Sequence, residues 1–231
     1  MKEKNKKYFF ITNIILFVCA IICLIFYDIF GSLWLKGFTS SWFVILGLVN
    51  LIYAKKMKTE NFRFLLLIET GLIFGMCADI LLGLWFIGGI LSFALGHIMY
   101  VIAFYTLEKF SKKDVLFILP IAVISMYIVA GTPYIQIEDP LLKKLLLGYA
   151  IIIACMLGKT ISNVFENKSL SRKLMLIGCT MFWFSDIVLA FDMFGESSRL
   201  TWILCSYVYW PAQCILAFSL FHFVNDSNAK Y

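Results

Sequence analysis

Eight long runs of apolar residues, almost free of charged side chains, constrain this chain more than any other feature of its sequence. A helix needs roughly 20 apolar residues to cross a hydrocarbon layer of roughly 30 Å. The runs cover residues 8–26, 38–53, 64–83, 86–107, 115–130, 141–157, 174–191 and 201–221. We therefore expect an all-α fold, a polytopic membrane bundle of eight transmembrane helices that forms a single domain over residues 1–231.

The composition excludes several classes of protein. Hydrophobic residues make up 62% of the chain and charged residues only 15%, and the mean hydropathy is +0.90. A soluble domain of ordinary composition carries about 25% charged residues. Because eight spans leave room only for short loops, the sequence excludes a sizeable soluble domain, and with it a nucleic-acid-binding domain and a Rossmann or P-loop enzyme.

The basic residues predict the orientation of the bundle. Sixteen of the 20 Lys and Arg residues lie before the first run, after the last, or in the connections 54–63, 108–114 and 158–173; the other four are Lys36, Lys143, Lys144 and Arg199. Since Lys and Arg remain on the cytoplasmic side, we expect both termini to be cytoplasmic. We expect an integral protein of a bacterial cytoplasmic membrane and no nucleic-acid partner, because topology explains the net charge of +6.

The first run follows four lysines, as the apolar part of a signal peptide does. It is about 19 residues long and has no small-residue cleavage site, so we expect a retained helix. The seven cysteines all fall within predicted spans and form no CxxC pair. Within a membrane they behave as small apolar residues, and with only two histidines in the chain we expect no disulfide, no metal and no cofactor.

Three acids and one histidine lie within the predicted spans: Glu69, Asp79, His97 and Asp186. A charged side chain at the centre of a membrane helix costs about 2.5 to 3.5 kcal/mol on insertion scales, so these residues are candidates for function. At 1.5 Å per residue, Asp79 and Asp186 both lie roughly 6 to 9 Å inside the outer boundary, and His97 lies near the middle. Glu69 is closer to the inner end, where we expect it to reach the interface or to pair with Arg63.

Other polar and aromatic side chains share helical faces with these residues. Spacings of three or four residues group Phe93, His97, Tyr100 and Phe104 on one helix, Phe182, Trp183 and Asp186 on a second, and Tyr209, Trp210 and Gln213 on a third. Ser185 is adjacent to Asp186, and Gly75 and Gly83 flank Asp79. Taken singly, Tyr100 or Gln213 is expected only to join helices, by a hydrogen bond of about 0.6 kcal/mol. Two aspartates instead indicate proton chemistry, because an amide or a hydroxyl would serve to join helices.

Four segments, Gly75–Leu82, Phe93–Tyr100, Phe182–Ala190 and Tyr209–Gln213, occur in an order and at a spacing that resemble the YhhN family of integral membrane proteins. The likeness extends from about residue 36 to residue 218. This family includes the lysoplasmalogenases. The resemblance implies a multi-spanning enzyme that cleaves the vinyl ether bond of a lysophospholipid, the lysoplasmalogen, and releases a fatty aldehyde and a glycerophospho-base. Membrane lipids would also be its partners.

The resemblance also implies site residues. The two aspartates of the family fall on Asp79 and Asp186, its His and Tyr on His97 and Tyr100, and its Gln on Gln213. Two positions depart from the family pattern. Ala78 stands where a Gly is common, and Lys36-Gly37 stands where a Lys-Pro pair is common, so only the charge of Lys36 is retained.

Hydrolysis of a vinyl ether needs an acid that protonates carbon, and a carboxylate or base that stabilises the oxocarbenium ion and aligns water. Burial and mutual repulsion favour one proton shared by two aspartates. We expect Asp186 to be the donor, because Phe182 and Trp183 exclude water from it. His97, Tyr100, Gln213, Ser185 and Tyr209 would orient the carboxyls, the water or the lipid, and Lys36, helped by Arg199, would pair with the lipid phosphate.

Two other functions use the same residues. A proton- or cation-coupled transporter would use Glu69, Asp79, His97 and Asp186 as a relay, and a repeated Asp-Ile-x-Leu element at Asp79 and Asp186 hints at two parallel halves. Pro120 and Pro211 lie at unmatched positions of those halves, which disfavours a transporter. An intramembrane aspartyl protease lacks support because Asp79 is not preceded by Gly-x-Gly. Serine hydrolase chemistry lacks a Gly-x-Ser-x-Gly motif.

Overall fold

The structure is a computed structural model that describes the backbone of residues 2–228 and the side chains of residues 3–227. Lys230, one of the basic residues used to predict the orientation, lies outside the described residues. The described chain forms eight helices and no strand: α1 (Lys2–Phe30), α2 (Leu33–Met57), α3 (Phe62–Leu84), α4 (Phe86–Leu107), α5 (Lys112–Ala130), α6 (Pro140–Glu166), α7 (Leu170–Phe194) and α8 (Arg199–Asn228). Each is long and apolar enough to cross a membrane, so the predicted all-α membrane bundle of eight helices is confirmed.

Local chemistry explains why the helices end where they do. Gly31 separates α1 from α2 at a φ of 62°, a left-handed conformation that a glycine adopts without strain. Ser111 and Asp114 form a reciprocal capping box at the start of α5. Asp139 caps α6 by accepting a hydrogen bond from the backbone of Leu141. These signals set the short connections that fold the chain into antiparallel hairpins.

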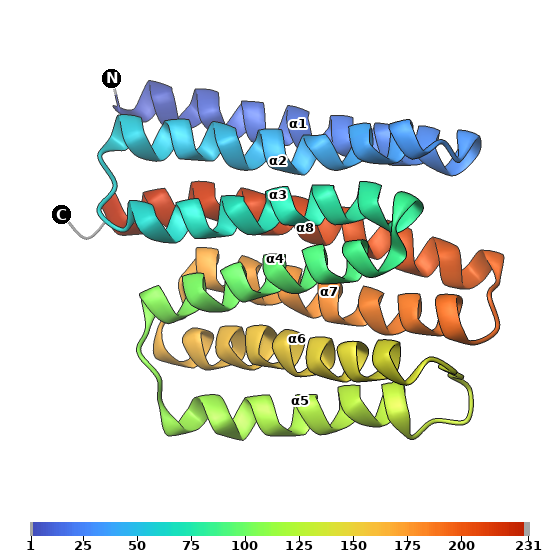
Figure 1. Ribbon diagram of the computed structural model, residues 1–231. Coiled ribbons are helices and arrows are strands. Elements are labelled where there is room, and N and C mark those ends of the chain that lie inside the picture. Colours follow the sequence, from blue (N-terminus) through green and yellow to red (C-terminus); the bar gives the residue numbers. More distant parts are fainter. Residues whose placement is uncertain (1, 229–231) are drawn as a thin grey trace.

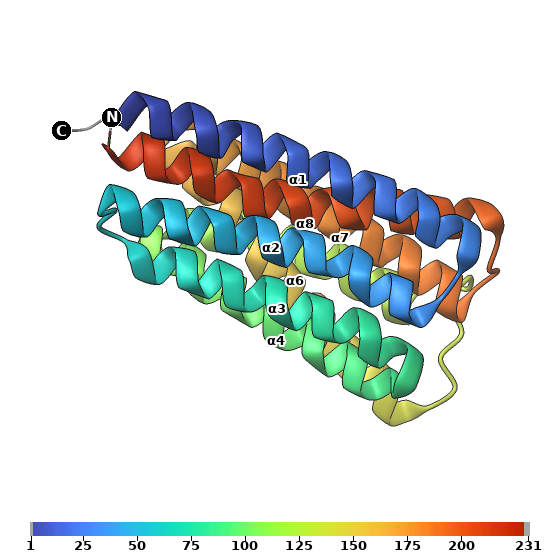
Figure 2. The same cartoon turned by 90° about the horizontal axis from the view of Figure 1, so that it is seen from above.

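Consecutive helices pack against each other except α4 and α5, which are separated by α6 (Figure 1). Helices α3 and α8 follow the α1–α2 hairpin, α4 packs on α3 and α7 on α8, and α6 and then α5 lie at the other edge (Figures 1 and 2). Helix α8 contacts α1, α2, α3 and α7, and α6 contacts α4, α5 and α7. The interior of the bundle therefore lies between α2, α3, α4, α7 and α8.

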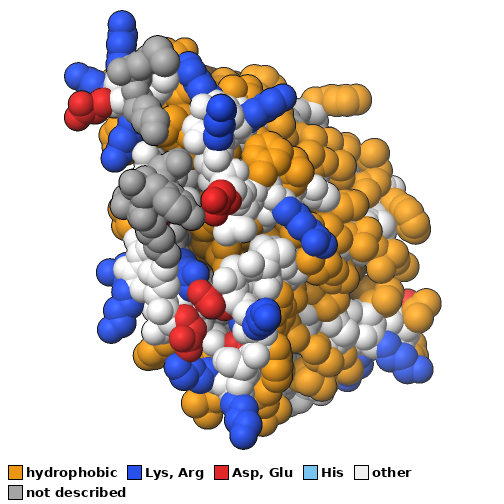
Figure 3. Space-filling model, turned by 90° about the vertical axis from the view of Figure 1, so that its left-hand side faces the viewer, with side chains coloured by type: hydrophobic (Ala, Val, Ile, Leu, Met, Phe, Trp, Pro, Cys, Tyr) orange, Lys and Arg blue, Asp and Glu red, His pale blue; other side chains and the backbone are white. Residues whose placement is uncertain are grey.

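The two ends of the bundle differ in charge. The first described residues, the end of α8 and the connections 58–61, 108–111 and 167–169 share one end, which we call the basic end. Figure 3 looks onto this end and shows Lys and Arg side chains spread over it with a few acidic side chains among them. The connections 31–32, 85, 131–139 and 195–198 share the opposite end, which we call the cavity end.

All the helices except α4 extend beyond the predicted runs, and α6 extends furthest past the end of its run. The sixth apolar run ends at residue 157 and Lys159 was assigned to a loop, but α6 continues to Glu166. Lys159 is wholly buried, and its Nζ lies 3.0 Å from an Asp114 carboxylate oxygen and also donates to the backbone oxygen of Lys109. The assignment to a loop is wrong because the partner that makes this charge tolerable inside the protein, Asp114, is distant in sequence.

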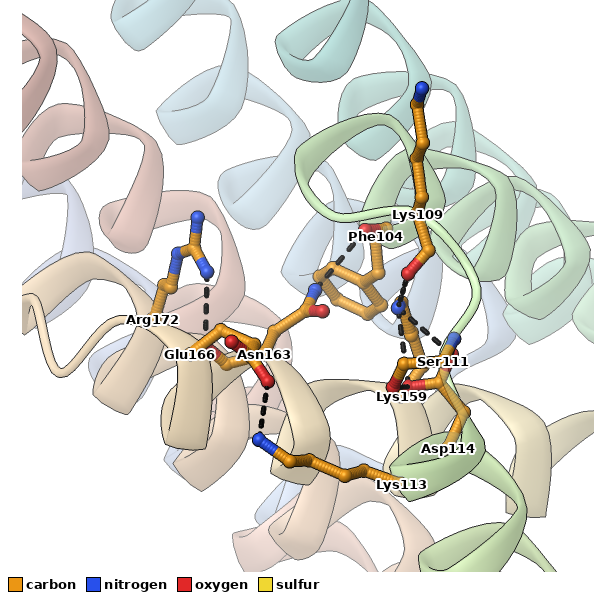
Figure 4. Close-up of polar contacts among 9 residues, drawn as sticks. All are labelled: Phe104, Lys109, Ser111, Lys113, Asp114, Lys159, Asn163, Glu166 and Arg172. Carbon is orange, nitrogen blue, oxygen red and sulfur yellow. Dashed lines mark hydrogen bonds and ion pairs between the residues drawn. The ribbon is translucent and has the colours of Figure 1, made fainter.

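The pair belongs to a polar network that joins the connections at the basic end (Figure 4). Arg172 donates to Glu108 at 2.7 Å and to the backbone oxygen of Asn163 at 3.0 Å. Asn163 in turn donates to the backbone oxygen of Phe104 at 3.1 Å. These bonds tie the ends of α4, α6 and α7 together. All seven cysteines of the chain are free.

Candidate active site

A cavity of about 470 Å³ lies at the cavity end and is lined by residues from all eight helices. Its wall is largely apolar, and five of the predicted site residues contribute to it: Lys36, Asp79, Ser185, Asp186 and Tyr209. Aromatic side chains fill much of the remainder, among them Trp183 and Trp210. The site is therefore a largely apolar cavity with a few polar groups in its wall.

Asp79 reaches the cavity from α3 and is surrounded by donors. Its side chain is 2% exposed. Ser40 and Tyr209 both donate to Oδ2, at 2.5 and 2.8 Å, and the ammonium of Lys36 lies 3.7 Å from Oδ1. Trp210 donates to Ser40 Oγ at 3.1 Å, which leaves the hydroxyl proton of Ser40 for Asp79. Two hydroxyls and one cation therefore favour the carboxylate form of Asp79.

Asp186 reaches the same cavity from α7 and has different partners. It is half-buried and accepts a short hydrogen bond from the Tyr149 hydroxyl on α6. Among the described residues, none of the ion pairs formed by Lys or Arg includes Asp186. Trp183, one turn before it, donates to Ser125 at 2.9 Å and lines the same wall. The Asp186 carboxyl thus lies in an apolar setting with a single neutral donor.

The two aspartates come from helices that lie apart. Helix α3 packs on α2, α4 and α8, whereas α7 packs on α6, α8 and weakly on α5. Both carboxyls nevertheless line one cavity. Each takes its hydrogen bonds from hydroxyls of its own. A molecule bound in the cavity would therefore contact two carboxyls that have different hydrogen-bond partners.

The other predicted site residues, His97, Tyr100 and Gln213, lie beneath the cavity. His97 is 1% exposed and its Nδ1–H donates to the backbone oxygen of Phe93 at 2.7 Å, while Nε2 has no hydrogen-bond partner in the part of the chain that the structure describes. Its ring meets the Tyr149 ring edge to face, with the centroids 5.3 Å apart. Tyr100 donates to Gln213 at 2.9 Å. These three residues do not line the cavity. They pack beneath the residues that form hydrogen bonds to Asp186 and Asp79.

Glycines on α3 make room for this supporting layer. A Cβ on Gly71 would lie 2.3 Å from the Tyr100 ring, and one on Gly75 would lie 2.9 Å from the Gln213 amide nitrogen. Because Asp79 follows Gly75 by one turn, Tyr100, Gln213 and Tyr209 are arranged in order along one face of α3.

Glu69 does not behave as expected. It is 3% exposed, and among the described residues neither of its carboxylate oxygens has a hydrogen-bond partner. It packs toward α2, where a Cβ on Gly47 would lie only 1.8 Å from Oε2. The prediction that it reaches the interface or pairs with Arg63 is wrong, because the side chain is enclosed between α2 and α3.

Sequence reasoning missed two residues that contact the aspartates. Ser40 follows Lys36 by four residues and so shares its helical face, a spacing that could have identified it. Tyr149 carries no such signal, since tyrosines are common in the chain and no polar residue marks its face. Only the packing of α6 against α7 brings its hydroxyl to Asp186.

A comparison with family models finds one match. The model of the YhhN family matches residues 36–220, which is most of the chain. This chain belongs to the YhhN family. The YhhN match begins in the first turn of α2, ends within α8 and includes every residue that contacts the two aspartates. Curated proteins and solved structures were also searched, and none matches.

Proposed function

We propose that this YhhN-family protein is a membrane-embedded hydrolase that cleaves the vinyl ether bond of lysoplasmalogens, releasing a fatty aldehyde and a glycerophospho-base. The observation that carries the proposal is the pair of carboxyls, Asp79 and Asp186, that line one largely apolar cavity with different partners. Membership of the YhhN family is consistent with this role. Buried acids in membrane proteins are costly and mark functional sites.

We infer different roles for the two carboxyls from their surroundings. Asp79 has two hydroxyl donors and the Lys36 ammonium, so it serves as the carboxylate. Asp186 has one neutral donor and apolar neighbours, which favour a protonated carboxyl, so it serves as the acid. This is the assignment that the neighbours of Asp186 in the sequence predicted. Lys36 then acts on Asp79, and the lipid phosphate needs another cation.

The reaction proceeds in balanced steps. Asp186 gives its proton to the vinyl carbon remote from oxygen, and the oxocarbenium ion that forms faces the negative charge of Asp79. Water adds to the carbon that bears oxygen, and its proton passes to Asp79. The resulting hemiacetal collapses to the aldehyde and the glycerol hydroxyl. A proton then returns from Asp79 to Asp186 through water in the cavity, as two carboxyls exchange roles in glycosidases.

Replacement of either aspartate by asparagine tests the proposal. Asp79→Asn and Asp186→Asn, each purified and mixed with a lysoplasmalogen, should each release aldehyde roughly 10² to 10⁴ times more slowly than the unchanged protein, the range expected for loss of a general acid or base. Glu166→Gln is the matched control, since Glu166 forms a partly exposed ion pair with Lys113 at the basic end. It should retain full activity.

Two results would contradict the assignment. If both asparagine variants are present in normal amounts and still release aldehyde at the normal rate, the aspartates do not perform the chemistry. If the unchanged protein releases no aldehyde from any lysoplasmalogen, the reaction itself is wrong.

A proton- or cation-coupled transporter remains the second candidate, and one observation favours it. Glu69 is enclosed with no hydrogen-bond partner on either oxygen, which the hydrolase does not require. Vesicles that contain the protein separate the two functions. A transporter would acidify or alkalinise the lumen when a gradient is imposed and would form no lipid product, whereas the hydrolase forms aldehyde without a gradient.

A further inference from the structure

We propose that the cavity takes its lipid from the leaflet at the cavity end, which is the outer leaflet of the membrane. The identity of the lipid rests on the proposed function. The end at which the bundle is open does not, because it follows from the structure alone. Three independent features carry it: the position of the lining residues, the filling of the opposite half, and the cation at the rim.

The cavity lies in one half of the bundle only. Its lining residues fall in the half of each helix nearer the connections 31–32, 85, 131–139 and 195–198. Gly31 and Leu33 contribute from the first connection and its flank, Phe86 from the second, and Phe194 from the end of α7. A lipid chain therefore reaches the two aspartates from this end without passing through the protein.

The other half of the bundle is filled with side chains. Phe64, Leu65, Phe104 and Leu220 are wholly buried there, on α3, α4 and α8. A second pocket, of about 380 Å³, lies at the basic end, but polar and charged residues such as Arg172 dominate its lining. An apolar chain from the leaflet at the basic end would meet a charged pocket first and a packed core next.

The rim of the cavity carries an exposed cation. Arg199 begins α8 with 61% of its side chain exposed, pairs with Asp28 of α1, and lies with its guanidinium 4.8 Å from the ring centroid of Trp202. Trp202 lines the cavity. A phosphate at the interface can bind Arg199 while its chain enters past Trp202, which supplies the cation that Lys36 does not.

The basic end identifies the leaflet. Lys and Arg concentrate at that end, and such residues remain in the cytoplasm, so the cavity end is external. A lysolipid keeps its charged headgroup at the surface, because transfer of a charge through hydrocarbon is costly. Lipids of the two leaflets are therefore separate pools, and only the outer pool would meet the cavity.

Sealed vesicles of opposite orientation test the inference. Lysoplasmalogen is added to right-side-out and to inside-out membrane vesicles from cells that contain the protein, and aldehyde is measured before and after permeabilisation with detergent. We expect activity in intact right-side-out vesicles, and in inside-out vesicles a loss of activity that detergent restores. Activity of intact inside-out vesicles equal to or above that of right-side-out vesicles would overturn the inference.

A second measurement does not depend on the reaction. Cys205 lines the cavity. In a variant that keeps Cys205 and has the other six cysteines replaced by alanine, a membrane-impermeant maleimide should label the right-side-out vesicles only. The matched control is a cysteine-free chain with Asn61→Cys, because Asn61 lines the pocket at the basic end. It should be labelled in inside-out vesicles only.

The two experiments separate the possible failures. If detergent-treated vesicles form no aldehyde, the proposed function fails, and the maleimide pattern still decides which side is open. Labelling of Cys205 from the cytoplasmic side would overturn the sidedness even if the protein is a hydrolase. Protection of Cys205 by a non-hydrolysable lysolipid ether would support occupation of the cavity by such a lipid.

Discussion

At the scale of single residues, the two aspartates illustrate how partners give identical side chains different roles. Asp79 receives two hydroxyl donors and a cation, whereas Asp186 receives one hydroxyl. The sequence alone could place both acids at matching depth, because a charge inside a membrane span is conspicuous. The spacing of Ser40 from Lys36 also marks Ser40, but nothing in the sequence shows that the Tyr149 hydroxyl reaches Asp186, because tyrosines are found throughout the chain.

Tyr149 is a positioning residue, and its removal should affect the chemical step. Tyr149→Phe deletes the one hydroxyl that donates to Asp186 within residues 3–227 and keeps the ring that packs on His97. Asp186 becomes negatively charged as it gives up its proton, and a hydrogen bond to a charged group is worth about 1.5 to 3 kcal/mol. We therefore expect kcat for aldehyde release to fall roughly 10- to 100-fold, with KM little changed.

Tyr53→Phe is the matched control for this experiment. Tyr53 is also buried and also donates a hydrogen bond, to Asn225, but it lies in the half of the bundle away from the cavity. Its loss should lower thermal stability slightly and leave kcat unchanged. Equal kcat values for Tyr149→Phe and the unchanged protein would show that Asp186 does not depend on this hydroxyl.

At the scale of helices, close packing between α3 and α4 depends on glycine. A Cβ on Gly71 would lie 2.3 Å from a ring carbon of Tyr100, which is closer than atoms pack. Gly71→Ala should therefore lower the free energy of unfolding by about 1 to 3 kcal/mol, the usual cost of overfilling a core. It should also displace Tyr100 from Gln213.

A glycine with open space around it provides the comparison. A Cβ on Gly148 of α6 would have no heavy atom within 4 Å, so Gly148→Ala should leave thermal unfolding in detergent unchanged or slightly raise the midpoint. If Gly71→Ala unfolds at the same temperature as Gly148→Ala, the helices α3 and α4 are not held as closely as the structure has them.

The buried ion pair between α5 and α6 should matter far more than the exposed one. Lys159→Met leaves Asp114 buried without its cation and should lower the free energy of unfolding by about 3 to 5 kcal/mol. Lys113→Met removes the partly exposed pair with Glu166 from the same two helices and should cost at most about 1 kcal/mol. Thermal unfolding in detergent measures both, and equal losses would contradict the burial of Lys159.

At the scale of the whole molecule, the fold could be predicted more fully than the site. Hydrophobic runs reveal spans because only a helix satisfies its own backbone within lipid. The same reasoning misjudged Lys159 and Glu69, since it treats every charge near a span end as exposed. Whether a charge is exposed depends on partners from other helices, and these come together only in the folded bundle.

Helix α1 shows a further property of the whole molecule. It lies before the residues that the family model matches, yet it contributes Tyr27 to the cavity wall. Asn13 on α1 and Asn50 on α2 exchange two hydrogen bonds, at 2.9 and 2.8 Å. Helix α1 is thus held to the rest of the bundle by its own polar contacts, and it completes the cavity wall that the other seven helices form.

The cavity ends at the layer of His97, Tyr100 and Gln213, and below it the helices α3, α4 and α8 are packed with large side chains. The bundle is accordingly hollow in the half at the cavity end and closely packed in the half at the basic end. Over that half of its thickness the described bundle is filled with large apolar side chains, so an ion that crossed this arrangement of the helices would have to leave water, which is costly.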